Sequence, residues 1–292
     1  MSVALGLLAD RVLGEPPAAV HPVRGFGTAM QAVERRLHRD SRAAGAAHAA
    51  IGLGIGALAG GALRSTTVAT YVAVAGRMLL ETATEIGLAL EAGDLDRGRT
   101  LLPSLVGRDP TGLDGSELAR AVVESVAENT VDAVVAPALW AMVAGAPGAL
   151  THRAVNTMDA MVGHRSARYT RYGTAAARLD DAMAWVPARV TAALVAAVRP
   201  AAARDVWRIV RRDAPAHPSP SAGVAEAAYA AALGLRLGGT VRYGDRVEQR
   251  PHLGDGAPAG PADIALAVRL TNEVTVALAA LACLPTVRRW RR

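Results

Sequence analysis

The sequence has no lysine, a single cysteine and few aromatic residues, and each shortage excludes a class of site. All 32 residues counted as Lys or Arg in the 292-residue chain are arginine, so the lysine-containing phosphate loop of many nucleotide-binding proteins is absent. Cys283 alone cannot form an internal disulfide or a multi-cysteine metal site. Aromatic residues make up 3% and do not alternate with arginine as they do in stacking surfaces, so we expect no nucleic-acid partner.

Charged residues are also missing from residues 45–63, a run that is long enough to cross a bilayer at about 20 residues per crossing. Hydrophobic residues make up 51% of the chain, and the mean hydropathy is +0.22. The glycines within the run are typical of helices that pack closely in lipid. Four arginines precede it and predict a cytoplasmic flank by the positive-inside tendency: Arg35, Arg36, Arg39 and Arg42.

Four further apolar segments are shorter or interrupted by charge: 66–80, 133–150, 185–198 and 274–285. The sequence therefore predicts one all-α, polytopic integral membrane domain over 1–292, with irregular polar loops. A small β-hairpin is expected near 240–253, where short strand patterns flank a glycine turn. On hydropathy alone a soluble helical bundle with alanine-rich core helices remains open. The N-terminus lacks the basic region of a secretory signal.

Three carboxylates follow one another at four-residue intervals in the stretch 121–143, which reads as one helix. Glu124, Glu128 and Asp132 therefore lie near one helix face, where like charges repel. Carboxylates gathered in this way can hold Mg²⁺, which prefers carboxylates together with substrate phosphates. Asn129 adds an amide on a nearby face. The alternative is that the carboxylates form ion pairs with nearby arginines.

Residues 156–189 form the densest polar block. Asn156 and Asp159 lie one helical turn apart, and Asp180 and Asp181 point to different sides of a helix. Four arginines in the block can grip phosphates in two-point contacts: Arg165, Arg168, Arg171 and Arg178. The alternative is a set of Arg–Asp ion pairs in an interfacial loop.

The stretch HPSPSAG, residues 217–223, predicts an irregular loop with His217, Ser219 and Ser221. A loop of this composition can present backbone N–H groups to an anion. The pattern is common, and by itself it is weak evidence for a site.

Four blocks of the sequence together resemble one protein family. They are LLADRVLGEPP…HPVRGFG, ESVAENTVD, NTMD…RYGTAAARLDD and HPSPSAG. Over about residues 5–270, and in this order, they resemble the CobD/CbiB family of adenosylcobinamide-phosphate synthases. Two positions depart from the family pattern: Glu15 stands in place of aspartate, and Ser221 in place of asparagine. Ser221 has no amide, which puts a direct ligand role there in doubt.

The resemblance implies an inner-membrane protein with its active site facing the cytoplasm. It implies an ATP-dependent amide bond between adenosylcobyric acid and (R)-1-amino-2-propanol or its O-phosphate. ATP is then a co-substrate, Mg²⁺ is required, and no tightly bound cofactor is expected apart from the corrinoid. Expected partners are these substrates and membrane lipid, with an oligomer and contacts to other cobalamin-assembly membrane enzymes left open.

Joining a carboxylate to an amine requires activation by ATP, anion binding and a proton acceptor. We assign catalytic roles to Glu124, Glu128, Asp132, Asp159 and His217. The predicted metal ligands are Glu124, Glu128, Asp132, Asp180 and Asp181. The predicted ATP-binding and substrate-binding residues are Arg165, Arg168, Arg171, Arg178, Ser219, Ser221, Asn129 and Asn156.

Two other functions are retained as alternatives. RYGTAAARLDD loosely resembles the two-metal aspartate helix of membrane alcohol phosphotransferases, but the paired Asp-Gly and Ala-Arg are not at the required spacing. A non-catalytic corrinoid-handling membrane component is the third reading. ATP consumption coupled to amide formation distinguishes the first function from both alternatives.

Overall fold

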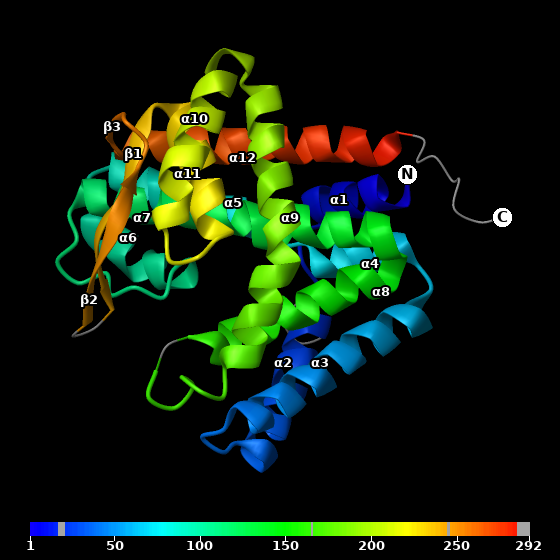
Figure 1. The fold of residues 1–292 in the computed structure, drawn as a ribbon. Coiled ribbons are helices and arrows are strands. Elements are labelled where there is room, and N and C mark those ends of the chain that lie inside the picture. Colours follow the sequence, from blue (N-terminus) through cyan, green and yellow to red (C-terminus); the bar gives the residue numbers. More distant parts are fainter. Residues whose placement is uncertain (17–20, 165, 244–245, 285–292) are drawn as a thin grey trace.

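A computed structural model describes residues 1–16, 21–164, 166–243 and 246–284. In these residues the protein is a bundle of helices with one small sheet at its edge (Figure 1). The α-helices are α1 (Ser2–Leu13), α2 (Pro22–Leu37), α3 (Arg42–Leu63), α4 (Thr66–Ala73), α5 (Gly76–Glu91), α6 (Leu95–Leu101), α7 (Gly115–Thr130), α8 (Ala136–Met158), α9 (Thr174–Val198), α10 (Ala203–Asp213), α11 (Ala222–Leu233) and α12 (Pro261–Cys283). Short 3₁₀ turns are η1 (Leu102–Ser104), η4 (Pro200–Ala202) and η5 (Ala214–Ala216).

The longest helical run in the described chain joins α7 and α8 through a π-helical turn, η2 (Val131–Val135), and ends in a second one, η3 (Asp159–Gly163). A capping box between Asp114 and Glu117 starts the run by satisfying free N–H groups. Within α8, Gly145 has φ of 64° and breaks the helix just before Pro147. The predicted segment 133–150 is therefore helical but bent at its GAP sequence, since a positive φ suits glycine and proline cannot continue the hydrogen-bond ladder.

Glycines in α3 allow this helix to pack closely on α8. A Cβ atom on Gly56 would lie 2.9 Å from the Leu150 carbonyl oxygen, and one on Gly60 would lie 2.4 Å from the Cα of Pro147. Only glycine permits such backbone contact. Helix α3 contains the predicted segment 45–63 whole, and its glycines have the predicted packing role.

Four helices in the described chain are long and apolar enough to cross a membrane, judged by length and composition: Arg42–Leu63, Gly115–Gly163, Thr174–Val198 and Pro261–Cys283. They contain three of the five predicted segments in full, and the fourth, 274–285, as far as Cys283. The candidate segment 66–80 is divided between two helices, because α4 ends at Ala73 and α5 begins at Gly76. The N–H of Ala75 instead donates to the Ala133 carbonyl at 3.0 Å. The protein is a mostly helical, polytopic membrane protein.

Large apolar side chains are exposed on α1, α12 and the second half of α3: Leu5, Leu8, Val12, Ile55, Leu58, Leu63, Val276 and Leu281. Helix α1 meets the end of α12, where the amino group of Met1 donates to the Ala282 carbonyl at 3.0 Å, on the right of Figure 1. A large exposed apolar surface of this kind suits lipid.

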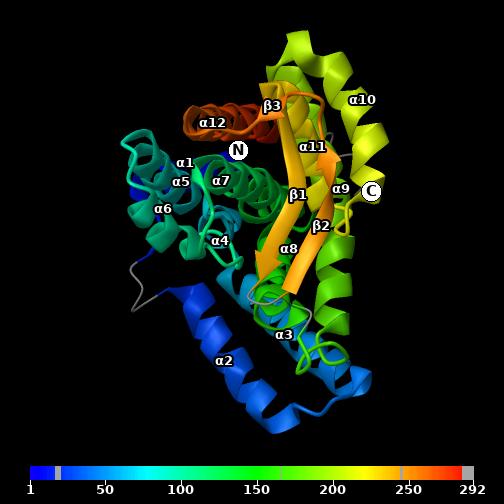
Figure 2. The same cartoon turned by 90° about the vertical axis from the view of Figure 1, so that its left-hand side faces the viewer.

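The sheet lies at the opposite end of α12 (Figures 1 and 2). Strands β1 (Leu235–Tyr243) and β2 (Arg246–Leu253) pair antiparallel with Thr240 opposite Gln249, which confirms the predicted hairpin. A short strand, β3 (Ala257–Pro258), adds to β1 in parallel. The ladder is irregular between Leu237 and Gly239, so the intervening Gly238 is free to turn its N–H toward α7.

Candidate functional site

Carboxylates from α7, η2, η3 and α9 interact with one another. Asp132 from η2 interacts electrostatically with Asp180 on α9, Glu128 on α7 and Asp159 on η3. Asp159 and Asp180 also interact with Asp181. Five acidic residues that the sequence selected are thus neighbours, although up to 53 positions separate them along the chain. We call Glu128, Asp132, Asp159, Asp180 and Asp181 the acidic cluster.

Local backbone geometry positions two carboxylates of the acidic cluster. Asp132 and Asp159 each lie in a π-helical turn, a distortion that is frequent at functional sites. Gly163 ends the second turn, and a Cβ atom there would lie 1.8 Å from Oδ1 of Asp159. Glycine at 163 therefore leaves the space that the Asp159 carboxylate occupies. The Asn156 amide of α8 donates to Oδ1 of Asp180 on α9 at 3.4 Å.

Solvent reaches the acidic cluster at Glu128. Residues 121–127 of α7 are all buried, whereas Glu128 is exposed and Asn129 and Asp132 are half-buried. The Asn129 amide donates to the Ser125 carbonyl at 2.9 Å. A ligand can therefore approach Glu128 although the helix that carries it runs through the core.

Glu124 has a different environment from Glu128. Its Oε2 lies 2.6 Å from Nη2 of Arg108, in an ion pair whose side chains are 2% and 7% exposed. Its Oε1 accepts a hydrogen bond of 2.8 Å from the Gly238 N–H of β1. Both oxygens of Glu124 thus have protein partners, so the ion-pair alternative holds for this carboxylate, which fastens the sheet to α7.

Among the described residues, no three His, Cys, Asp or Glu side chains are placed together as metal ligands. Helix geometry explains why the 124/128/132 set is not compact. Residues four apart are rotated by about 40° and displaced by about 6 Å, so Glu124 and Asp132 diverge by about 80° and 12 Å. The predicted five-carboxylate metal set is therefore not assembled, and Mg²⁺ would need ligands from a substrate as well.

His217 and Glu226 face each other deep in the protein, beside Glu124. Nε2 of His217 lies 3.7 Å from Oε1 of Glu226, and the side chains are 2% and 1% exposed. Neither this nitrogen nor either Glu226 oxygen has a hydrogen-bond partner in the described part of the chain. Burial lowers the pKa of His217 and raises the pKa of Glu226 well above its ordinary value. Both groups therefore favour their neutral forms and have unused hydrogen-bonding capacity.

The two serines near His217 organise the start of α11. The Ser219 N–H and carbonyl oxygen lie 3.1 Å and 3.0 Å from Nδ1 of His217. The Ser219 hydroxyl accepts a bond of 3.3 Å from the Ala222 N–H and lies 3.3 Å from the Ser221 hydroxyl. The predicted loop is therefore a compact turn that fixes the His217 ring, while the binding roles predicted for Ser219 and Ser221 stay predictions.

The arginines predicted to hold phosphate are not gathered at the acidic cluster. Arg168 donates to Oε1 of Glu34 at 2.9 Å, so its ion-pair alternative holds. Arg171 lies 4.0 Å from Asp40, with both side chains exposed, and Arg178 is exposed on α9. Arg165 lies outside the described residues.

Other arginines are close to the carboxylates instead. Arg108 and Arg250 interact electrostatically with Glu128 and Glu226, and Arg153 interacts with Asp132. These arginines and Glu226 were not predicted from the sequence as site residues. One signal was available, because Glu226 is the only charged residue in the twelve-residue helix AGVAEAAYAAAL, and an isolated charge on an apolar helix is a functional candidate.

Arg153 lies between the acidic cluster and the N-terminal motif LLADRVLGEPP, which contains Asp10 and Glu15. This arginine interacts electrostatically with Glu15, Asp132 and Asp10. Glu15 in turn lies 3.0 Å from Nε2 of His21. Glutamate at position 15, where the family usually has aspartate, therefore still supplies a carboxylate to this connection.

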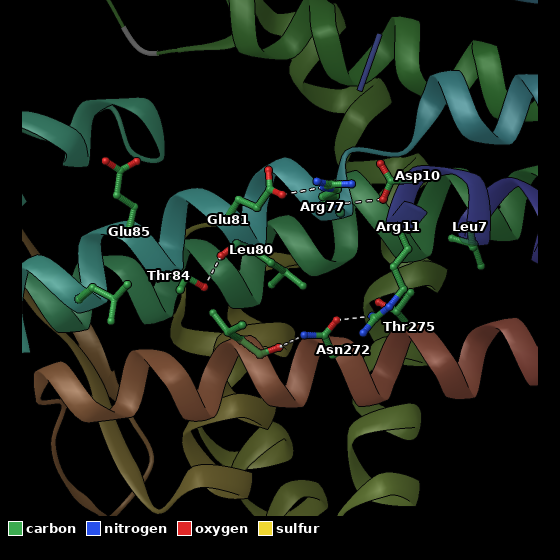
Figure 3. A pocket seen from close by; sticks show the side chains of 13 residues that line it. Leu7, Asp10, Arg11, Arg77, Leu80, Glu81, Thr84, Glu85, Asn272 and Thr275 are labelled. Atoms are coloured by element: carbon green, nitrogen blue, oxygen red, sulfur yellow. Dashed lines mark hydrogen bonds and ion pairs between the residues drawn. The ribbon is translucent and has the colours of Figure 1, made fainter. Parts of the chain in front are cut away.

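Asp10 also lines a cavity of about 520 Å³ between α1, α5 and α12 (Figure 3). Most polar groups in this cavity have partners. The Arg77 guanidinium pairs with Glu81 at 2.6 Å, and the backbone N–H of Arg77 donates to Oδ2 of Asp10 at 3.1 Å. The Arg11 guanidinium donates to the side-chain oxygen of Asn272. The cavity therefore offers a ligand chiefly the apolar side chains of Leu7, Leu80, Leu88 and Val268.

Comparisons with known proteins agree with the motifs. The family model described as CobD/Cbib protein matches residues 3–271. The Cobalamin biosynthesis protein CobD of Mycobacterium tuberculosis (strain CDC 1551 / Oshkosh) is 46% identical over 99% of this chain and 96% of its own length. The proteins of the same name from Chromobacterium violaceum and Geobacter metallireducens are 42% and 39% identical, over 92% and 89% of this chain and 91% and 87% of their own lengths. No solved structure matches the chain.

The matched region contains every element of the site, from Asp10 on α1 to Arg250 on β2. The family model and the relatives both cover most of the chain. The chain therefore belongs to the CobD/CbiB family.

Proposed function

We propose that the protein forms an amide bond between adenosylcobyric acid and (R)-1-amino-2-propanol or its O-phosphate, with consumption of ATP. Membership of a cobalamin-biosynthesis family supports the substrate class. The observation that carries the proposed chemistry is the solvent-accessible Glu128 beside Asp132, Asp159 and Asp180. A group of carboxylates attracts an ammonium ion and can take up its proton.

The proposed reaction has two steps. The corrinoid carboxylate attacks the γ-phosphorus of ATP, which forms an acyl phosphate and releases ADP. The amine nitrogen then attacks the carbonyl carbon and the C–O bond to phosphate breaks, which releases inorganic phosphate. The amine must first lose a proton, and Glu128 is the proposed acceptor. Arg250, which interacts with Glu128, stabilises the anionic groups that form.

Mg²⁺ enters this proposal as part of the MgATP substrate. Such an ion is commonly held by one or two carboxylates together with phosphate oxygens. Asp132 and Asp180 are the proposed pair because they are close neighbours from different helices. Asp181, Asn129 and Asn156 remain candidates for contacts with the substrate or its ion.

The decisive assay uses the purified protein in detergent with adenosylcobyric acid, ATP, Mg²⁺ and each amine separately. Mass spectrometry should detect adenosylcobinamide or its phosphate, with one ADP released for each amide formed. Phosphoryl transfer to an alcohol without amide formation would instead support a phosphotransferase. Binding of the corrinoid without ATP turnover would support a non-catalytic role.

We further propose that the protein resides in the inner membrane with the acidic cluster open to the cytoplasm. The uncharged residues of α3 predict that it stays in the membrane fraction after carbonate extraction, because lipid burial of this helix leaves no side-chain charge unpaired. Immunoblots of the two fractions provide the measurement. Recovery of most of the protein in the carbonate supernatant would contradict an integral membrane location.

Gly163→Ala should reduce amide formation by about 100-fold, the effect of displacing a reacting group by about 1 Å. The added methyl group would overlap Oδ1 of Asp159 and push this carboxylate out of the acidic cluster. Gly54→Ala on α3 is the matched control, because nothing lies within 4 Å of the added Cβ atom there. Equal rates for the two variants would show that the position of Asp159 is unimportant.

Arg168→Lys should change the rate of amide formation by less than about fivefold, because Arg168 pairs with Glu34 and not with the acidic cluster. The Arg168 side chain is 55% exposed and is paired with Glu34, so lysine can keep the pairing. Steady-state kinetics with varied ATP gives the measurement. A tenfold or larger rise in KM for ATP would restore the phosphate-binding role predicted from the sequence.

A further inference from the structure

A separate cavity of about 480 Å³ opens between α9, α10, η5 and the start of α11. Its lining combines cationic, aromatic and rigid apolar side chains, and none of its lining residues is acidic. The residues on which the inference rests are Arg189, Trp207, Arg211, Pro215, His217 and Pro220.

The positive charge of this cavity is not neutralised as it is elsewhere on α10. Arg208 and Arg212 on this helix both pair with Asp255, at 2.8 Å and 2.6 Å. Arg211 is exposed and has no acidic partner in the described chain. Arg189 stacks on the Trp185 ring at 3.7 Å and donates to the Trp185 carbonyl, which fixes its position without cancelling its charge. The two guanidinium groups therefore suit an anion, and phosphate oxygens match their planar donors.

The remaining walls suit a flat apolar group. Trp207 presents an indole ring, and Pro215 and Pro220 present rigid rings. Such surfaces cost little conformational entropy when they bind a ligand. An aromatic base can stack on an indole, as bases do on aromatic side chains in nucleic-acid complexes. Positive charge and an aromatic side chain that line the same cavity match a nucleotide.

His217 connects this cavity to the proposed reaction centre. It lines the cavity, and its Nε2 faces Glu226 at 3.7 Å without a hydrogen-bond partner in the parts of the chain that are described. Glu226 interacts electrostatically with Glu124 and Glu128. A ligand in the cavity therefore lies one side chain away from the buried carboxylates.

We propose that this cavity binds ATP, with its phosphates against Arg189 and Arg211 and its adenine against Trp207. This inference rests on the proposed ATP-dependent function and deepens it by giving the nucleotide a place. This site does not include the arginines between 165 and 178 that were predicted from the sequence to bind phosphate. His217 then borders the phosphate chain on the side that faces Glu226.

Equilibrium binding of radiolabelled ATP to the purified protein in detergent tests the charged part of the site. Arg211→Gln should weaken ATP binding by about 10-fold or more, as expected for loss of a charge-assisted phosphate contact. Arg35→Gln on α2 is the matched control, because it removes the same charge from an exposed helical position outside this cavity. Equal dissociation constants for the two variants would overturn the proposal.

Binding of inorganic tripolyphosphate, which has no adenine, tests whether Trp207 contacts the base of ATP. Trp207→Leu should weaken binding of ATP several-fold, at the lower end of the range of about 1–3 kcal/mol measured for base stacking, and leave tripolyphosphate binding unchanged. Retained tripolyphosphate binding also shows that the variant is folded. If wild-type protein binds tripolyphosphate as tightly as ATP, the cavity is a polyphosphate site and the proposed adenine contact is wrong.

The amide assay separates failure of this inference from failure of the proposed function. A protein that makes amide from ATP but binds ATP equally well with and without Arg211 has its nucleotide site elsewhere. A protein that binds ATP through Arg211 but makes no amide retains the nucleotide site and loses the proposed reaction.

Discussion

Glu128→Gln should lower amide formation by at least about 100-fold, within the range of about 10²–10⁴ that positioned acid–base groups contribute. The carboxylate is exposed while the seven residues before it are buried, so it is available to a substrate. Glutamine has nearly the same shape but can neither attract an ammonium ion nor accept its proton. The measurement is the initial rate of amide formation at saturating amine and ATP.

The stability of Glu128→Gln should be close to that of the wild type, because an exposed side chain contributes little to packing. Thermal unfolding in detergent checks this point. Glu117→Gln is a matched control on the same helix: Glu117 accepts from the Asp114 N–H at 3.0 Å, and a glutamine oxygen can still do so. Near wild-type turnover by Glu128→Gln would remove Glu128 from the reaction and contradict the role of the acidic cluster.

The helical fold was largely predictable because hydropathy and glycine content report directly on packing in lipid. The uncharged run 45–63 predicted helix α3, whose glycines contact α8, and the short strand patterns near 240–253 predicted the hairpin. The break between α4 and α5 was not predictable. It depends on a hydrogen bond from Ala75 to Ala133, a tertiary partner that no local pattern reveals.

The sequence identified most of the acidic residues of the candidate site, apart from Glu226, but none of the arginines that lie near them. Carboxylates such as Asp132 and Asp180 are conspicuous in apolar helices, and burying several of them is acceptable only where they have a use. Arginine is frequent throughout this lysine-free chain, so its position in the sequence carries little information. Arg168 binds Glu34, whereas Arg108, from a loop before α7, reaches Glu124.

Glu124 and Glu128 have different roles although their positions in the sequence look equivalent. A four-residue spacing places side chains near one face but lets them drift around the helix. Glu124 thereby points to Arg108 and the sheet, and Glu128 points to solvent. We therefore expect Glu124 to support the site and Glu128 to act in it.

Arg108→Met should lower the free energy of unfolding by about 3–5 kcal/mol, the usual effect of removing one partner from a buried ion pair. The change leaves the Glu124 carboxylate, 2% exposed, without its guanidinium partner. The Gly238 N–H would remain its hydrogen-bond donor, and one such bond is too weak to offset a buried charge. Thermal unfolding in detergent, followed by loss of helical circular dichroism, gives the measurement.

The double variant Arg108→Met/Glu124→Gln should recover most of that stability, because neither charge is then buried alone. Its glutamine oxygen can still accept from the Gly238 N–H, so the sheet stays attached to α7. If Glu124 only supports the site, the double variant should also regain amide formation to within about tenfold of wild type, equivalent to about 1.4 kcal/mol in the barrier. A stable double variant without activity would instead make Glu124 a participant in catalysis, as its spacing in the sequence first suggested.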